Sequence, residues 1–183
     1  MQFYAISWEV LHMFAFQLAK KVQKKGPYDY IIAIARGGLS IGHMLTDFLD
    51  LPILILNLSS YTHYTDKQEV TLLESFNANI AHKRVLLVDD VSDTGDSFIK
   101  AMEIIRAKKP LRIVSASVFI KPQTHFRPDF HCKETTKWIV FPSEIRETAQ
   151  GFKHMYKDPQ QAKIQLQKIG IHEQFIQEYI EKK

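Results

Sequence analysis

The chain has 183 residues, of which 45% are hydrophobic and 24% charged, a composition that predicts an ordinary globular domain with a small extension. Its 24 Lys and Arg residues against 20 Asp and Glu give a net charge of +4, too small a surplus to require a nucleic-acid partner. The one cysteine, Cys132, excludes an internal disulfide framework and suits a reducing compartment. The first residues lack a secretory-signal pattern, and no apolar run approaches the roughly 20 residues that cross a bilayer, so we expect a cytoplasmic protein with no membrane partner.

Apolar residues recur every three or four positions after Ser7, which predicts an amphipathic helix with Ser7 as its N-cap. The expected packing stripe consists of Val10, Leu11, Phe14, Leu18 and Val22. Four lysines within residues 20–25, followed by Gly26-Pro27, are typical of a helix end. We therefore interpret this cluster of cations as a solvated helix end rather than as a nucleic-acid site.

The rest of the chain alternates apolar strands with amphipathic helices. We expect a strand over residues 30–35, a helix over 40–49, a strand over 53–57, a polar stretch over 59–81, a strand over 85–88, a helix over 97–109, strands over 112–119 and 138–141, and a helical tail from residue 158. This alternation predicts an α/β fold with an open, mostly parallel sheet flanked by helices. In such sheets, ligands bind outside the carboxyl ends of the strands.

The most informative segment follows the expected strand at residues 85–88. It reads Asp89, Asp90, Val91, Ser92, Asp93, Thr94, Gly95, Asp96 and Ser97. Its small residues, its hydroxyls and the start of the next helix are suited to hold a phosphate, although the pattern of a P-loop is absent. Carboxylates beside a phosphate repel it unless they bind sugar hydroxyls or hold Mg²⁺. An ordinary strand–turn–helix with acidic caps explains four carboxylates within nine residues poorly.

This segment resembles the phosphoribosyl-diphosphate (PRPP) motif of type I phosphoribosyltransferases, and its surroundings resemble the purine members that act on hypoxanthine, guanine or xanthine. The resemblance covers most of residues 1–150, the expected phosphoribosyltransferase domain with its small hood region, and leaves residues 151–183 as a helical C-terminal extension. It implies that residues 89–97 bind the ribose and 5′-phosphate of PRPP. It further implies that Asp89 and Asp90 bind Mg²⁺ and that Asp93 is the catalytic residue, taking a proton at purine N7.

Two further segments fit the same resemblance. Ala35, Arg36 and Gly37 lie where the family places its pyrophosphate loop, often with a cis peptide bond, which here would join Ala35 to Arg36. Ser60 and Tyr61 open the polar stretch, as in the mobile loop that covers the active site of purine members. The resemblance therefore implies a pyrophosphate site and a lid.

The resemblance also implies a purine site. Lys121 would contact the exocyclic oxygen of the base, Trp138 would stack on its ring, and the backbone of Ile139 would contact its edge. Glu144 would be a further metal ligand. Two positions depart from the family pattern, since Asp96 stands where a neutral or basic residue is more frequent and Ser143 replaces a bulky aromatic residue.

The implied activity is the Mg²⁺-dependent transfer of phosphoribosyl from PRPP to a 6-oxopurine in purine salvage, by a homodimer or homotetramer. Two alternatives remain: a PRPP-sensing regulator of the same fold that binds RNA or DNA, and a transferase with a non-purine acceptor. A zinc site made of His125, His131 and Cys132 is disfavoured, because the usual ligand spacing is absent.

Overall fold

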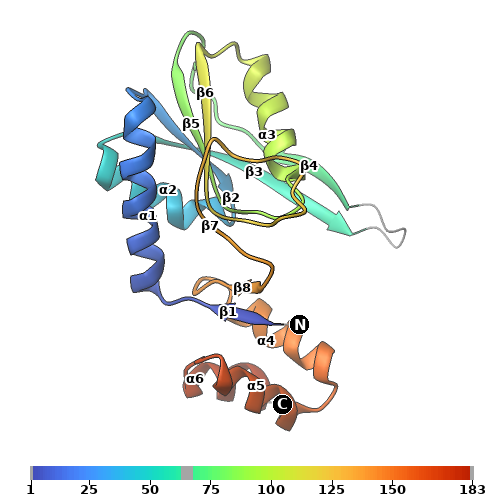
Figure 1. The fold of residues 1–183 in the computed structure, drawn as a ribbon. Helices are drawn as coiled ribbons and strands as arrows, with labels where there is room; N and C mark the ends of the chain where they lie inside the picture. The colour runs from blue at the N-terminus through green and yellow to red at the C-terminus, as the bar shows by residue number, and fades with distance from the viewer. Residues whose placement is uncertain (1, 63–67, 182–183) are drawn as a thin grey trace. The chain divides into compact units, whose positions relative to one another are not determined.

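The computed structural model describes residues 2–62 and 68–181, which form two compact units (Figure 1). One unit is the continuous segment His12–Thr136, and the other joins Met1–Leu11 to Lys137–Lys183. The predicted boundary at residue 150 falls inside a helix, α4 (Ile145–Tyr156), so the two units divide the chain elsewhere. No helix in the described part of the chain is long and apolar enough to span a bilayer.

The unit His12–Thr136 is built on a six-stranded sheet with the order β4-β3-β2-β5-β6-β7. Its strands are β2 (Tyr30–Ala35), β3 (Ile53–Thr62), β4 (Gln68–Glu74), β5 (Arg84–Ser92), β6 (Arg112–Ile120) and β7 (Phe130–Glu134). Only the β3–β4 pair among them is antiparallel. The predicted α/β class with a mostly parallel sheet flanked by helices is confirmed.

Helices cover both faces of this sheet, which explains its unbroken apolar strands. Ile32 and Ile34 of β2 pack in a core cluster with α3 (Asp96–Ala107), which contributes Phe98 and Ile105. On the opposite face, Gly42 of α2 (Gly38–Leu49) lies against Ala33 of β2. Successive side chains of a strand point to opposite faces. Because helices cover both faces, the side chains on either face of β2 are buried.

The first helix is α1 (Trp8–Val22), which begins in one unit and ends in the other. Ser7 Oγ accepts a hydrogen bond from the Val10 N–H at 3.2 Å, which confirms the predicted N-cap. A 3₁₀ turn, η1 (Gln23–Lys25), ends the helical segment at the predicted place. The predicted stripe is correct for Leu11, Leu18 and Val22 but wrong for Val10, which is exposed.

The polar stretch expected at residues 59–81 is corrected by the structure. Strand β3 continues to Thr62, and β4 returns beside it as an antiparallel partner. Ser60 and Tyr61, expected at the start of an irregular loop, therefore lie in a strand, where Ser60 pairs with Val70. An antiparallel strand at the edge of a sheet can face solvent and contain many polar residues. Its composition then resembles that of a loop, which is why the sequence predicted one here. Residues 63–67 of that expected loop lie outside the described residues.

The strand expected at residues 138–141 does not belong to the central sheet. It forms β8 (Trp138–Val140), which pairs in parallel with the short N-terminal strand β1 (Phe3–Ala5). The same unit contains α4, α5 (Pro159–Lys168), α6 (Glu173–Ile176) and a π-helical turn, η2 (Gln177–Glu181). Its core cluster consists of Ala149, Phe152, Ala162, Leu166, Ile176 and Ile180. The predicted helical tail is thus present and packs on α4.

Candidate functional site

Two segments far apart in the sequence meet at the carboxyl edge of the central sheet. Strands β2 and β5 are parallel neighbours, with Ala33 opposite Val88, so the loops that follow them lie side by side. The chain leaves β2 through a cis peptide bond between Ala35 and Arg36, as the family resemblance implied. The expected pyrophosphate loop and the expected PRPP motif are therefore neighbours in space.

The two glycines of the loop after β2 allow this close approach. A Cβ atom on Gly37 would lie 2.6 Å from both carboxylate oxygens of Asp90. A Cβ atom on Gly38 would lie 2.5 Å from the carbonyl oxygen of Val88, a distance that real Cβ atoms do not show. The loop backbone thus rests directly on the acidic end of β5.

The acidic pair is buried, with Asp89 and Asp90 each only 7% exposed. The Asp90 N–H donates to Asp89 Oδ1 at 2.9 Å, and the Gly38 N–H also binds the Asp89 carboxylate. Burial raises the pKa of Asp89 well above its ordinary value, and the adjacent Asp90 charge raises it further against the effect of these N–H groups. Two adjacent buried carboxylates are costly unless a cation or hydroxyl donors meet them.

The donor chemistry of this pair fits Mg²⁺. Protein sites usually hold Mg²⁺ through one or two carboxylates, and water and substrate phosphates complete its shell. Across residues 2–62 and 68–181, no group of three or more His, Cys, Asp or Glu side chains is placed to hold a metal ion. A metal at Asp89 and Asp90 would therefore need additional oxygens from a ligand.

The turn after β5 leads into helix α3 through a residue that favours glycine. Gly95 has a φ of 97°, in the left-handed region, and is the N-cap of α3. Thr94 Oγ1 donates to Asp96 Oδ2 at 2.8 Å. The turn leaves the positive end of α3 beside the loop, an arrangement suited to an anion.

The segment after β6 packs against this turn. The His125 N–H donates to the Thr94 carbonyl at 2.7 Å, and the Ser92 hydroxyl donates to the Phe126 carbonyl at 2.7 Å. A Cβ atom on Gly95 would lie 2.6 Å from the Phe126 nitrogen. The path of the turn is therefore fixed by a segment some thirty residues further along the chain.

Lys121 and Gln123 bring side chains of that segment to Asp93. Lys121 is 6% exposed, and burial lowers its pKa while the charge of Asp93 opposes this effect. Gln123 Nε2 donates to Asp93 Oδ1 at 2.8 Å. Gln123 was not among the residues predicted from the sequence. Its Lys-Pro-Gln context indicates a turn, but no local pattern shows which strand end a turn will contact.

Three predicted site residues belong to the other compact unit. Trp138, at the start of β8, is 52% exposed, whereas Ile139 is 7% exposed. The Trp138 N–H donates to the Gln2 carbonyl at 2.9 Å, which ties β8 to the N-terminus. Glu144 is the N-cap residue of α4. The residues predicted for the purine site therefore divide between the two units, and Lys121 belongs to the central-sheet unit.

Two of the residues considered for zinc lie on β7. Burial raises the pKa of the Cys132 thiol to about 11, and this thiol donates to the Phe14 carbonyl at 3.4 Å. Burial likewise lowers the pKa of His131. A thiol with a raised pKa is a poor metal ligand at neutral pH, because the thiolate is the binding form.

Comparisons with known proteins identify the family of this chain. The family model for the phosphoribosyl transferase domain matches residues 10–150. The xanthine-guanine phosphoribosyltransferase of Nitratidesulfovibrio vulgaris is 30% identical over 148 residues, which are 78% of this chain and 86% of that protein. The solved structure of a purine phosphoribosyltransferase from Pyrococcus horikoshii has a TM-score of 0.71 and 31% identity, and the match covers 78% of this chain and 94% of that one.

A further solved structure shows the fold alone. The xanthine-guanine-hypoxanthine phosphoribosyltransferase of Helicobacter pylori matches with a TM-score of 0.70 and 24% identity over 86% of this chain and all of that one (100%). The chain belongs to the phosphoribosyltransferase family. It is accordingly an enzyme of the glycosyltransferase class, similar to the purine members of that family.

Proposed function

We propose that this enzyme transfers the 5-phosphoribosyl group of PRPP to a 6-oxopurine base, hypoxanthine, guanine or xanthine, in a Mg²⁺-dependent reaction of purine salvage that releases pyrophosphate. The observation that carries the proposal is the contact between the glycine loop after β2 and the acidic end of β5. The relative named for xanthine and guanine supports the class of base.

The sugar phosphate is assigned to the turn after β5. The N–H groups at the start of α3 and the hydroxyls of Thr94 and Ser97 hold the 5′-phosphate. Asp89 and Asp90 accept hydrogen bonds from the ribose hydroxyls or hold Mg²⁺. Arg36, with the backbone of Ala35 and Gly37, binds the pyrophosphate group.

The metal proposal rests on the buried acidic pair. Asp89 and Asp90 would hold Mg²⁺, with Glu144 as a further candidate ligand. When bound, the ion would neutralise charge on the pyrophosphate oxygens. The raised pKa of Asp89 supports the need for a cation or hydroxyl donors at this position.

The chemistry is a displacement at C1 of the ribose. The bond from C1 to the pyrophosphate oxygen breaks as positive charge develops at C1, and Arg36 stabilises the negative charge on the leaving group. The purine N9 bonds to C1 while Asp93 accepts the proton from N7. Gln123 restricts the orientation of the Asp93 carboxylate through its hydrogen bond.

The base is assigned to three residues. Lys121 donates to the exocyclic oxygen of the purine, and the exposed indole of Trp138 stacks on its ring. The backbone of Ile139 contacts the edge of the base. Ser60 and Tyr61 on the β3–β4 hairpin would belong to the segment that excludes water during the reaction. Assembly as a homodimer or homotetramer and a cytoplasmic location stay predictions.

The direct test is an assay of pyrophosphate release from PRPP and Mg²⁺ with a panel of bases. We expect turnover with at least one of hypoxanthine, guanine and xanthine. Turnover only with uracil or orotate would replace the purine acceptor by a pyrimidine. Tight PRPP binding without turnover of any base would instead indicate a regulatory protein, for which salt-dependent RNA binding is the next measurement.

The role of Asp93 is tested by Asp93→Asn. An amide cannot act as a general base. We therefore expect kcat to fall at least a hundredfold, while the Kd of PRPP changes by less than about threefold. Asp47→Asn is the matched control, since Asp47 is an exposed carboxylate on α2. Equal losses in kcat and in PRPP affinity would contradict the assigned role.

A further inference from the structure

Asp96 introduces a negative charge into the turn that the proposed function assigns to the 5′-phosphate. It is the first residue of α3 and directly follows the N-cap Gly95. A carboxylate in the first turn of a helix interacts favourably with the positive end of that helix. The turn therefore already contains an anion of its own at the place where a phosphate would gain the same interaction.

The Asp96 carboxylate also accepts a hydrogen bond from the Thr94 hydroxyl, which is one of the donors of this turn. Thr94 Oγ1 donates to Asp96 Oδ2 at 2.8 Å, and the Asp96 N–H lies 3.4 Å from Thr94 Oγ1. A hydroxyl has a single proton to donate. While Thr94 donates to Asp96, the same proton is not available to a phosphate oxygen. The hydroxyl is therefore already used by a contact within the turn.

We propose that Asp96 weakens 5′-phosphate binding by competing with that phosphate for the Thr94 hydroxyl and for the start of α3. This inference rests on the proposed function. Binding of PRPP requires the Thr94 hydroxyl to leave Asp96 and brings a phosphate dianion close to a carboxylate. The same cost applies to the nucleoside monophosphate product. Asp96 therefore weakens product binding and speeds product release.

The charge of Asp96 is tested with Asp96→Asn, which keeps the size of the side chain. We expect ribose 5-phosphate, the probe for the turn alone, to bind about tenfold more tightly, the scale of one like-charge contact that water largely screens. The affinity for pyrophosphate in Mg²⁺, the probe for the Arg36 loop, should change by less than about twofold. Isothermal titration calorimetry gives both constants.

Salt and a second substitution separate charge from shape. Salt ions screen the repulsion between Asp96 and the phosphate. The gain in ribose 5-phosphate affinity of Asp96→Asn should therefore shrink as the salt concentration rises from about 0.02 to 0.5 M. Asp96→Lys reverses the charge and should bind ribose 5-phosphate more tightly still. Asp47→Asn is the matched control, with the same chemical change on the exposed face of α2, and should leave ribose 5-phosphate binding unchanged.

The competition for the hydroxyl is tested by a double-mutant cycle. Thr94→Val should weaken ribose 5-phosphate binding by less than about threefold in the wild-type background, because the hydroxyl is already engaged with Asp96. In an Asp96→Ala background the same change should cost about tenfold or more, since the hydroxyl then serves only the phosphate. Equal losses in the two backgrounds would show that no competition exists.

The outcomes also distinguish this inference from the proposed function. An active wild type whose Asp96→Asn and Asp96→Lys variants melt normally and bind ribose 5-phosphate no more tightly would overturn the role of Asp96 and leave the function intact. A wild type that neither binds ribose 5-phosphate nor releases pyrophosphate with any base would overturn the function, and the inference with it.

Discussion

Gly37 and Gly38 are adjacent in the sequence but meet different parts of the same strand. An added Cβ on Gly37 would contact the Asp90 carboxylate, a side chain that can turn. An added Cβ on Gly38 would contact the Val88 carbonyl, which belongs to the central strand β5 and cannot move alone. The two positions therefore separate an effect on the site from an effect on the fold.

We expect Gly38→Ala to lower the free energy of unfolding by about 2 kcal/mol or more, because the backbone must shift to relieve the overlap. Gly37→Ala should lower it by less, yet reduce kcat/KM for PRPP at least tenfold by displacing the Asp90 carboxylate. Urea denaturation and steady-state kinetics provide the two measurements.

Gly151→Ala is the control for these glycine variants. Nothing lies within 4 Å of a Cβ atom on Gly151, which is inside α4. Alanine favours a helix over glycine by about 1 kcal/mol, so this variant should be as stable as the wild type or more stable. Destabilisation of Gly37→Ala as large as that of Gly38→Ala would contradict the distinction between side-chain and backbone contacts.

At the scale of single residues, the sequence identified most of the candidate site because its chemistry is local. Four carboxylates, three hydroxyls and a glycine within residues 89–97 predict a phosphate and metal site without knowledge of the fold. Gln123 was not predicted, because its role depends on the contact with Asp93, thirty positions earlier in the chain. Long-range contacts of loops have no signature in a local pattern.

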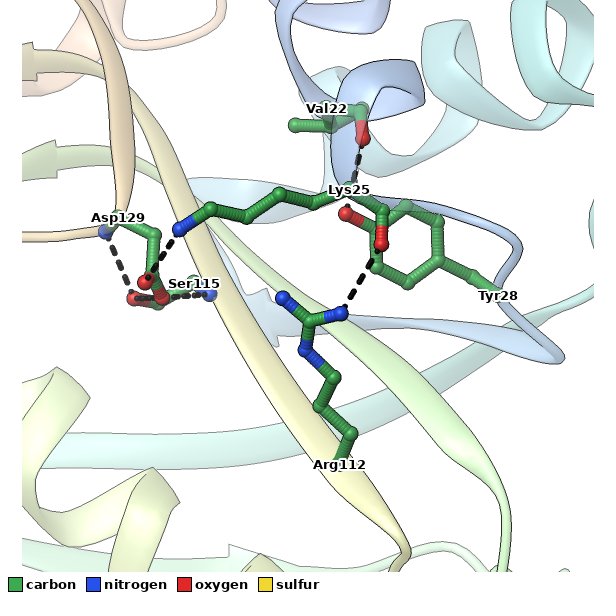
Figure 2. A network of polar contacts seen from close by, with 6 residues as sticks. All are labelled: Val22, Lys25, Tyr28, Arg112, Ser115 and Asp129. Atoms are coloured by element: carbon green, nitrogen blue, oxygen red, sulfur yellow. Dashed lines mark hydrogen bonds and ion pairs between the residues drawn. The ribbon is translucent and has the colours of Figure 1, made fainter.

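At the scale of elements, Asp129 connects β7 to β6 and to the end of the first helical segment (Figure 2). Its carboxylate accepts hydrogen bonds from the N–H and the hydroxyl of Ser115, both at 2.9 Å. Lys25 Nζ lies 3.5 Å from the other carboxylate oxygen, and Arg112 donates to the Lys25 carbonyl at 3.2 Å. These contacts gather three segments at the amino edge of the sheet.

Asp129→Asn tests this network through its dependence on pH. Burial opposes ionisation, but the Ser115 hydrogen bonds and Lys25 outweigh it and lower the pKa of Asp129. A lowered pKa stabilises the folded state above the unfolded pKa of about 3.9, and the contribution is lost as pH falls below that value. The expected cost of Asp129→Asn is about 1 kcal/mol at pH 7, because the side chain is 39% exposed.

Urea denaturation at pH 7 and at pH 3 measures this difference against the wild type. The cost of Asp129→Asn should shrink at pH 3, because the stabilisation that a lowered pKa provides is lost as pH falls below the unfolded value. Asp47→Asn, an exposed position on α2, should show little cost at either pH. A cost of Asp129→Asn that is the same at both pH values would show that the hydrogen-bond geometry matters and the charge does not.

The strands that the sequence predicted well are the ones that are buried on both faces. Residues 31–34 of β2 and 85–88 of β5 are at most 3% exposed, and their unbroken apolar runs follow directly from that burial. The edge strands β4 and β7 are only partly buried, so their mixed composition resembles that of loops. Strand β1 was not predicted, because its three residues form a strand only by pairing with β8.

At the scale of the whole molecule, one compact unit interrupts the other along the chain. The unit His12–Thr136 carries the PRPP-motif residues, whereas Trp138, Ile139 and Glu144 belong to the unit that contains both chain ends. This second unit is held by the β1–β8 pair and by the core around Phe152, whose ring centroid lies 4.6 Å from that of Phe3.

Phe152→Ala should separate the stabilities of the two units. Removal of this 2% exposed side chain should destabilise its own unit by about 3–5 kcal/mol. Hydrogen-exchange protection should fall in α4 and α5 and persist in β2 and β5. Ribose 5-phosphate binding should persist while purine turnover falls, because Trp138 belongs to the destabilised unit.

Phe175→Ala is the control in the same unit, since Phe175 is 45% exposed and should cost less than about 1 kcal/mol. An equal loss of protection in both units of Phe152→Ala would show that they unfold as one.

The sequence by itself determined the α/β class, the buried strands and the acidic turn, because apolar runs and clustered donors are local properties of the chain. It also placed the net positive charge outside residues 89–97, which contain four carboxylates and no cation. Only the tertiary structure decided that Gly37 rests on Asp90, that Gln123 donates to Asp93 and that β8 pairs with β1. Those contacts join segments far apart in the chain, and their energies depend on shape and burial that no window of sequence contains.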